Sequence, residues 1–150
     1  MSTDPARLEA AIAFAARAHQ DQVDKAGRPY IAHLLRVSDA LALHGCDAQI
    51  AGVLHDIIED AGVTADDLYD AGFPAAVVQA VEACTRREGE TYMSLVARAA
   101  ADPLGRLVKL ADNYDNSDED RLKALDPAVA ARLRAKYARA REVLENKEEW

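Results

Sequence analysis

Apolar residues recur at three- and four-residue steps along most of the chain, which is the spacing of an amphipathic α-helix. The clearest case lies near the C-terminus, where one stripe contains Val129, Leu133, Tyr137, Ala140 and Leu144. No segment convincingly predicts a β-strand, and no repeat is evident. We therefore expect helices near residues 5–21, 31–44, 47–60, 65–70, 74–85, 92–101, 103–115 and 127–147.

Residues that cap helices support these boundaries. Asp and Thr side chains accept hydrogen bonds at a helix N-terminus, and proline favours the first helical position. By this criterion the candidate N-caps are Asp4, Asp47, Thr64, Thr91, Asp102 and Asp126, and three of them precede proline. Gly45 is expected to end a helix, and residues 21–29 and 116–125 are expected to form polar loops.

The polar face of the C-terminal helix is strongly basic. It carries Arg132, Arg134, Lys136, Arg139 and Arg141. We interpret this run as a solvated surface, because charged runs on a helix usually face water. The alternative is that the helix lies beside a binding site for an anionic ligand.

Composition also favours an all-α protein. Half of the 150 residues are hydrophobic, alanine is frequent and only 5% are aromatic, which favours packed helices over a β-sandwich or barrel. We expect one bundle of about eight helices forming a single domain over residues 1–150. The net charge of −8 argues against a nucleic-acid partner, which would require clustered lysine and arginine. The sequence does not indicate an oligomeric state.

The cysteines and the N-terminal segment indicate the cellular setting. Cys46 and Cys84 lack the spacing of a thiolate metal site or a disulfide framework, and both lie among apolar residues. We expect buried free thiols in a reducing compartment. The first ten residues lack the features of a signal peptide, and no segment approaches about 18 uninterrupted apolar residues. We therefore expect a cytoplasmic protein without a membrane partner.

The segment from His55 to Asp60 carries the strongest chemical signal. Imidazole and carboxylate groups are good ligands for divalent metals. On a continuous helix, Glu59 would lie one turn from His55 and Asp60 one turn from Asp56, so four polar groups would share one edge of an apolar segment. Burying these carboxylates is costly unless a cation compensates them, which indicates a metal site. The alternative is an exposed acidic helix end with an incidental histidine.

Two further residues complete a set of metal ligands. His33 lies early in one apolar helix, and Asp112 interrupts another near its end. Together with His55 and Asp56 they would supply two nitrogen and two oxygen ligands, leaving coordination positions for water and substrate. The alternatives are a core histidine at His33 and an exposed polar position at Asp112. Our leading prediction is that His33, His55, Asp56 and Asp112 hold one divalent metal ion.

The order His…HDxxED…KLADxxxN resembles the HD superfamily, and within it the hydrolase domain of RelA/SpoT homologues, including small alarmone hydrolases of the Mesh type. The matching stretches are Ala18–Gln22, Lys25–His33, Ala51–Asp60, Thr85–Tyr92 and Lys109–Asn116. The resemblance implies an all-helical HD domain, a divalent cofactor that is usually Mn²⁺, and a small-molecule nucleotide as substrate. The activity it implies is removal of pyrophosphate from the 3′ position of guanosine tetra- or pentaphosphate, (p)ppGpp.

The resemblance also implies roles for individual residues. It assigns metal binding to the same four residues predicted above. Glu59 and Asp60 match the catalytic acidic pair that orients and deprotonates the attacking water. Lys25 matches a cation near the phosphates, and Asn116 matches a residue that contacts the nucleoside.

Three acids depart from the family pattern. Asp24 stands where the family usually has an arginine against the guanine base, and Asp118 and Glu119 stand where it usually has an Arg-Thr pair. These acids are expected beside a highly charged nucleotide, so the substrate stays open. One alternative is an HD phosphohydrolase acting on another nucleotide. A nucleotide-binding regulatory module without catalysis is the other, although the intact acids Glu59 and Asp60 favour an enzyme.

Overall fold

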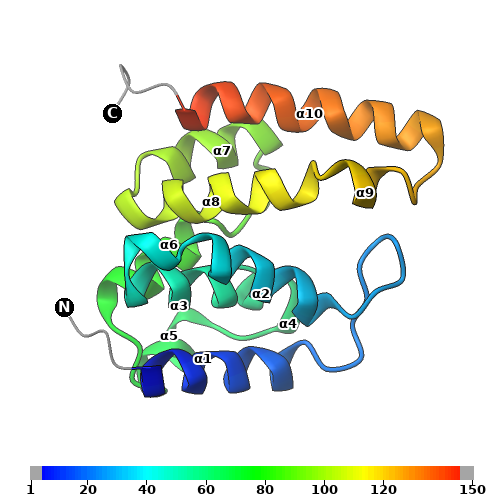
Figure 1. Ribbon diagram of the computed structural model, residues 1–150. Helices are drawn as coiled ribbons and strands as arrows, with labels where there is room; N and C mark the ends of the chain where they lie inside the picture. The colour runs from blue at the N-terminus through cyan, green and yellow to red at the C-terminus, as the bar shows by residue number, and fades with distance from the viewer. Residues whose placement is uncertain (1–4, 146–150) are drawn as a thin grey trace.

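The computed structural model describes residues 5–145, and helices joined by short connections make up that range (Figure 1). The only β-structure among these residues is an isolated antiparallel bridge between Val23 and Pro29, which closes the loop between the first two helices. The prediction of an all-α fold is confirmed.

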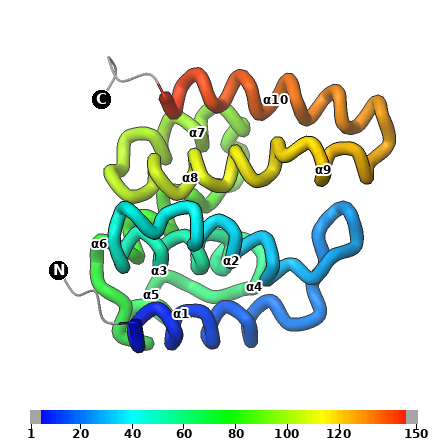
Figure 2. The backbone as a smooth tube through the Cα atoms, in the orientation of Figure 1, coloured from blue at the N-terminus to red at the C-terminus, as the bar shows by residue number. Residues whose placement is uncertain are grey.

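Helix α8 (Pro103–Asn116) lies at the centre of the bundle. The elements are α1 (Pro5–Ala18), α2 (Tyr30–Ala40), the 3₁₀-helix η1 (Ala42–His44), α3 (Cys46–Leu54), α4 (Ile57–Ala61), α5 (Ala65–Asp70), α6 (Ala75–Ala83), α7 (Tyr92–Ala100), α8 (Pro103–Asn116), α9 (Glu119–Leu122) and α10 (Pro127–Glu145). In Figure 2, α1 lies on one side, α2 and α3 come next, and α8 separates them from α10. Helix α8 packs against α2, α3, α6, α7 and α10.

Helix α3 forms the middle of the main core. Most of its residues are buried, as expected for a helix that is apolar on nearly every side. It approaches α2 closely at Gly52, where a Cβ atom would lie 2.9 Å from Leu41 Cδ1. The Ser38 hydroxyl donates to the carbonyl oxygen of Gln49 at 3.0 Å and joins the same two helices. This close contact holds α3 against the C-terminal end of α2.

Apolar clusters attach the last helices to the rest. The largest cluster involves α1–α6 with contributions from α7 and α8. One smaller cluster joins α7, α8 and α10, and another joins α9 to α10. The predicted apolar stripe of the last helix is confirmed, since the buried residues of α10 are Ala130, Leu133, Tyr137, Ala140 and Leu144. Val129 is partly buried against the same surface.

Three predicted segments differ in the structure. Segment 47–60 is two helices, because the chain leaves the helical path at His55 and Asp56 and resumes at Ile57. Segment 31–44 divides into α2 and η1. The prediction of a loop over residues 116–125 is wrong in part, since Asp118 accepts a hydrogen bond from the Arg121 N–H at 3.3 Å and caps the short helix α9.

Most of the predicted caps are confirmed. Side chains that accept hydrogen bonds from backbone N–H groups in the first helical turn are Thr64, Thr91, Asp102 and Asp126. Asp47 is not an N-cap. That position of α3 is Gly45, which follows η1 with a φ of 99° that favours glycine, and Asp47 pairs with Arg7 at 2.8 Å. Asp4 and the predicted helical residues after 145 lie outside the described residues.

Two expectations about the cellular setting are also testable on the structure. Cys46 and Cys84 are buried and form no disulfide within the described residues, as predicted. Between residues 5 and 145, no helix combines the length and the apolar character that crossing a membrane requires.

Replacing Leu34 by alanine should strongly destabilise the protein, because this α2 side chain is 0% exposed within the main cluster. We expect the free energy of unfolding to fall by about 2–5 kcal/mol, the usual cost for a buried leucine. Leu43→Ala is the matched control, since Leu43 is 100% exposed, and it should change stability by less than about 0.5 kcal/mol. Urea denaturation followed by circular dichroism measures both, and equal effects would contradict this assignment of the core.

Candidate functional site

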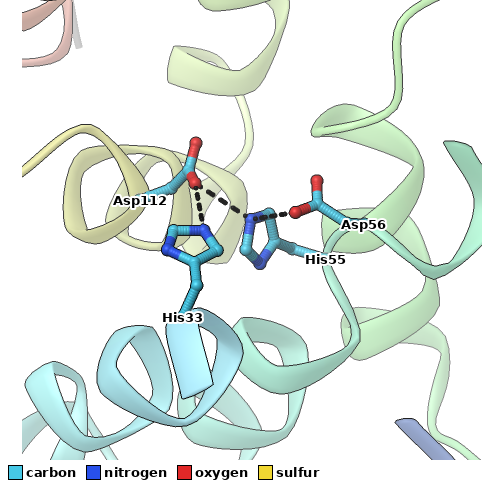
Figure 3. Close-up of side chains that lie close together, drawn as sticks. All are labelled: His33, His55, Asp56 and Asp112. Atoms are coloured by element: carbon cyan, nitrogen blue, oxygen red, sulfur yellow. Dashed lines mark hydrogen bonds and ion pairs between the residues drawn. The ribbon is translucent and has the colours of Figure 1, made fainter. Parts of the chain in front are cut away.

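Four ionisable side chains from separate parts of the chain meet between α2, α3 and α8. His33 comes from α2, His55 and Asp56 from the junction of α3 and α4, and Asp112 from α8 (Figure 3). One ligand atom from each lies within 4.8 Å of the other three. Both histidines are 1% exposed. The fold thus brings together the four residues selected from the sequence, which span 79 positions.

The break between α3 and α4 lets two consecutive residues serve one site. Adjacent residues on a regular helix do not face each other. Here Asp56 has φ −102° and ψ 3°, in the sparsely populated bridge region of backbone conformation, and its Oδ2 lies 3.1 Å from His55 Nε2. The expectation of a continuous helix here is wrong. A hydrogen bond from Asp60 N–H to the Asp56 carbonyl oxygen, at 2.9 Å, still sets Asp60 one turn after Asp56.

Hydrogen bonds at Nδ1 fix the orientation of both imidazoles. His55 Nδ1 donates to the carbonyl oxygen of Gly52 at 2.7 Å, and His33 Nδ1 donates to Asp115 Oδ2 at 2.5 Å. Each Nε2 is left facing Asp112 Oδ1, at 2.9 Å for His33 and 3.2 Å for His55. Figure 3 shows both rings directed at this carboxylate. Metal-binding histidines are usually oriented in this way, through the nitrogen that does not bind the metal.

The cluster needs a positive charge at its centre, because imidazole nitrogens here face carboxylate oxygens. Without a metal, a proton supplies it. Burial lowers the pKa of His55, but Asp56 and Asp112 raise it well above its usual value. Burial also opposes ionisation of Asp112, yet Lys109 and the histidines hold the pKa of Asp112 well below its ordinary range. A divalent ion would supply the same charge, and this mixed set of nitrogen and oxygen donors suits such an ion.

A cavity of about 370 Å³ opens onto the cluster, a volume within the range of small-molecule sites. The predicted site residues that line it are Lys25, Asp56, Glu59, Asp60, Asp112 and Asn116. His33 and His55 lie behind them in the interior. Tyr30 also lines the cavity, and its hydroxyl donates to Asp56 Oδ2 at 2.5 Å. Burial and the nearby Asp56 raise the pKa of Tyr30, so this donor stays protonated.

The predicted acidic pair borders the cluster from α4. Glu59 Oε1 accepts a hydrogen bond from the backbone N–H of Arg86 at 2.8 Å, which ties α4 to the segment after α6. Loss of surrounding water, together with the charges of Asp56 and Glu59, raises the pKa of Asp60 to about 6. A carboxylate with this pKa is suited to accept a proton from water near neutral pH.

The two predicted substrate contacts differ in how they are held. Lys25 lines the cavity and makes no ion pair within the described part of the chain. Asn116 is already engaged, since its Nδ2 donates to Asp112 Oδ1 at 3.0 Å and its Oδ1 accepts from Arg121 Nη1 at 3.1 Å. Asn116 therefore joins the cluster of His33, His55, Asp56 and Asp112 to α9.

The three acids that depart from the RelA/SpoT pattern all have partners. Asp24 accepts two backbone hydrogen bonds from its own loop, at 2.9 and 3.0 Å, and its Oδ2 lies 3.2 Å from Arg121 Nη2. Asp118 caps α9, and Glu119 pairs with Arg134 at 2.9 Å. Of the three, only Asp24 lines the cavity, and its charge is compensated there.

Sequence analysis missed Asp115 and Arg121. Asp115 orients His33, and its position three residues after Asp112 on α8 was a usable signal, because residues at that spacing share a helix face. Arg121 Nη1 lies 2.7 Å from Asp115 Oδ2, and Arg121 also reaches Asp24. No local signal indicated Arg121, since it lies on a helix that was expected to be a loop and contacts residues far away in sequence.

Comparisons with known proteins identify the family of this chain. Residues 11–103 match the family model described as HD domain. The chain is 35% identical over 119 residues to the guanosine-3′,5′-bis(diphosphate) 3′-pyrophosphohydrolase of Aquifex aeolicus (strain VF5), covering 73% of this chain and 17% of that protein. It is 33% identical over 148 residues to the bifunctional (p)ppGpp synthase/hydrolase RelA of Mycobacterium tuberculosis, covering 92% and 18% respectively. The chain spans less than a fifth of the length of these relatives.

The fold is also similar to a solved structure, that of a metazoan ortholog of SpoT described as hydrolysing ppGpp and playing a role in starvation responses. The TM-score is 0.78 at 23% sequence identity, and the alignment covers 97% of this chain and 89% of the other. The similarity shows that the helical arrangement is shared over nearly the whole chain.

Replacing His55 by alanine should abolish specific metal binding, because it removes one of four closely spaced donors. We expect the affinity for a divalent ion to fall by more than about 100-fold, beyond the loss usual for a residue that only orients a ligand. His44→Ala is the control, since His44 is exposed on η1. Isothermal titration calorimetry measures both, and retained binding in His55→Ala would disprove the assignment.

Metal affinity should rise with pH. Burial lowers the pKa of His55, but Asp56 and Asp112 raise it well above its usual value, so an entering ion competes with a proton for this imidazole. We expect up to about a tenfold gain in affinity per pH unit for each proton displaced, until the pH exceeds that pKa. Calorimetry at one pH in two buffers of different ionisation enthalpy measures the released protons. Identical heats in the two buffers would contradict the expectation.

Proposed function

Because this chain belongs to the HD domain family, we propose that it is a metal-dependent phosphohydrolase that removes pyrophosphate from the 3′ position of (p)ppGpp. The observation that carries this proposal is the cavity, where the metal-binding cluster, two further acids and several basic side chains face one space. The names of the bacterial relatives and the description of the metazoan protein point to the same nucleotide. We propose that residues 1–150 act as one domain in this reaction.

The proposed cofactor is Mn²⁺, held by His33, His55, Asp56 and Asp112. Two imidazoles and two carboxylates also suit iron, cobalt or zinc, and the resemblance to RelA/SpoT hydrolases favours manganese among them. When bound, the ion supplies a Lewis acid that polarises a phosphate oxygen and lowers the pKa of water.

The acid–base work falls to Glu59 and Asp60 in this proposal. Water adds to the phosphorus attached to the ribose 3′ oxygen, and the bond between that phosphorus and that oxygen breaks. Asp60 takes up the water proton, for which its pKa of about 6 is suitable, while Glu59 orients the water. The 3′ oxygen gains a proton and leaves as a hydroxyl, giving pyrophosphate and guanosine di- or triphosphate. Lys25 binds the phosphates, and Asn116 contacts the nucleoside.

The cellular role follows from the substrate. (p)ppGpp is the alarmone of the stringent response, so the proposed activity would lower the level of that signal in the cytoplasm.

A second candidate is hydrolysis of a different nucleotide. Asp24 favours it, because an acid with a partner at Arg121 replaces the arginine that RelA/SpoT hydrolases usually place against guanine.

A nucleotide panel tests the proposal. The metal-loaded protein is incubated with ppGpp, pppGpp, GTP and 5′-mononucleotides, and released pyrophosphate and phosphate are followed. We expect ppGpp to yield equal amounts of GDP and pyrophosphate. Faster turnover of a simple nucleotide would favour the second candidate. Tight nucleotide binding without turnover in Mn²⁺, Co²⁺ or Mg²⁺ would instead identify a regulatory module and reject the enzyme.

Asp60→Asn should lower kcat by about 10²- to 10⁴-fold, the usual contribution of general acid–base catalysis. Metal affinity should be unchanged, because Asp60 is not one of the four clustered donors. Asp70→Asn, an exposed change on α5, is the control. In the unmodified protein, kcat should fall as the pH drops below about 6, where Asp60 becomes protonated. Full activity in Asp60→Asn would remove Asp60 from the mechanism.

A further inference from the structure

The cavity is lined by basic side chains that the proposed mechanism does not use. They include Arg86 from the segment after α6, Lys109 from α8 and Lys136 from α10, and they share the cavity lining with Lys25. These residues are far apart in sequence. They meet because α10 packs against both α7 and α8 (Figure 1). The basic face of α10 therefore reaches the cavity at one residue, Lys136.

Two of these ammonium groups share one aromatic ring. Lys109 Nζ lies 5.5 Å from the centroid of the Tyr92 ring, and Lys136 Nζ lies 4.2 Å from it. A cation over an aromatic ring is held by the electrons of the ring face. Tyr137, one residue further on α10, is also within range of Lys136 Nζ at 5.9 Å. Tyr92 thus holds Lys136 at the cavity without neutralising its charge.

Lys136 is the one basic residue of α10 (Pro127–Glu145) that lines the cavity, and its ammonium group has no acidic partner within the described residues. Within residues 5–145, neither Lys136 nor Arg86 makes an ion pair with a carboxylate. On the same helix, Arg134 pairs with Glu119 and Arg141 donates to Asn113 Oδ1 at 3.0 Å. Arg132 and Arg139 are exposed and do not line the cavity. For them the expectation of a solvated face holds.

The basic side chains that line the cavity repel one another, which disfavours their charged forms. Burial, followed by the charges of Lys25, Lys109 and Arg86, lowers the pKa of Lys136. The cavity lining contains five acidic and five basic side chains. A divalent ion would therefore make the occupied site net positive. A site of this kind favours a ligand with several negative charges.

We propose that Lys136 is a specificity-determining residue that binds a phosphate group of the substrate beyond the one held at the metal-binding cluster. With Lys25 and Arg86 it selects nucleotides that carry several phosphates over nucleotides with one. This inference rests on the proposed function, because it names the ligand class of the same cavity. The proposal makes α10 part of the substrate site. It also identifies a nucleotide phosphate as the anionic ligand beside the basic face of α10.

The test compares Lys136→Gln with Arg139→Gln, a matched loss of charge on the same helix outside the cavity. Binding of ppGpp and of guanosine 5′-monophosphate is measured by calorimetry at saturating Mn²⁺. An Asp60→Asn background slows the hydrolysis of ppGpp during the measurement. We expect Lys136→Gln to weaken ppGpp binding by about tenfold, the loss of one hydrogen bond to a charged group, and to change binding of the monophosphate by less than about twofold. Arg139→Gln should change neither, and Lys136→Arg should keep most of the ppGpp affinity.

Unchanged ppGpp binding in Lys136→Gln would overturn the proposal, and so would an equal loss for both nucleotides. Circular dichroism verifies that each variant is folded, which is expected because Lys136 is exposed at the rim. Steady-state kinetics in the unmodified background adds a second reading, in which Lys136→Gln should raise KM for ppGpp and leave kcat nearly constant. If no nucleotide is hydrolysed and binding still depends on Lys136, the proposed reaction fails while this inference stands.

Discussion

Two imidazole nitrogens and two carboxylates within 4.8 Å of one another cannot stay in a protein interior without a positive charge among them. The surrounding fold holds this arrangement from several sides. The glycine at position 52 lets α2 and α3 approach, so that His33 and His55 converge on Asp112. The same residue offers its carbonyl oxygen to His55 Nδ1. Helix α8 supplies Asp112 from the centre of the bundle, where this carboxylate is nearly buried and borders the cavity.

The sequence located most helices because their apolar faces and N-caps are local properties, as at Thr64, Thr91 and Asp102. The prediction from sequence was wrong where the backbone conformation at the site differs from the one that the local apolar pattern favours. The apolar run around His55 predicts an uninterrupted helix, yet the conformation of Asp56 breaks it so that both side chains reach one cluster. The four proposed metal ligands were selected from residue type and order. Their mutual geometry, and the carboxylate of Asp115 behind His33, depend on helix packing that no linear pattern specifies.

The effect of a charged residue on the cavity depends on the partner that it meets in the folded chain. Taken alone, Asp24 in place of an arginine suggests repulsion of a nucleotide. In the folded chain its carboxylate accepts hydrogen bonds from its own loop and contacts Arg121, which comes from 97 positions away. The same arginine reaches Asp115 and Asn116, so one guanidinium connects the first loop, the end of α8 and α9. The acid in one segment and the base in another leave the local charge close to balanced.

The cavity is built from two stretches of chain with different tasks. The matched HD region, residues 11–103, contains His33 and both members of the His55-Asp56 pair. Helices α9 and α10, which add Leu122, Lys136 and Tyr137 to the wall, follow it. These last helices are attached through small apolar clusters of their own. Their surface residues can therefore be substituted with little strain on the buried cluster, so the proposed preference for a ligand can be altered separately from the four residues proposed to hold the metal.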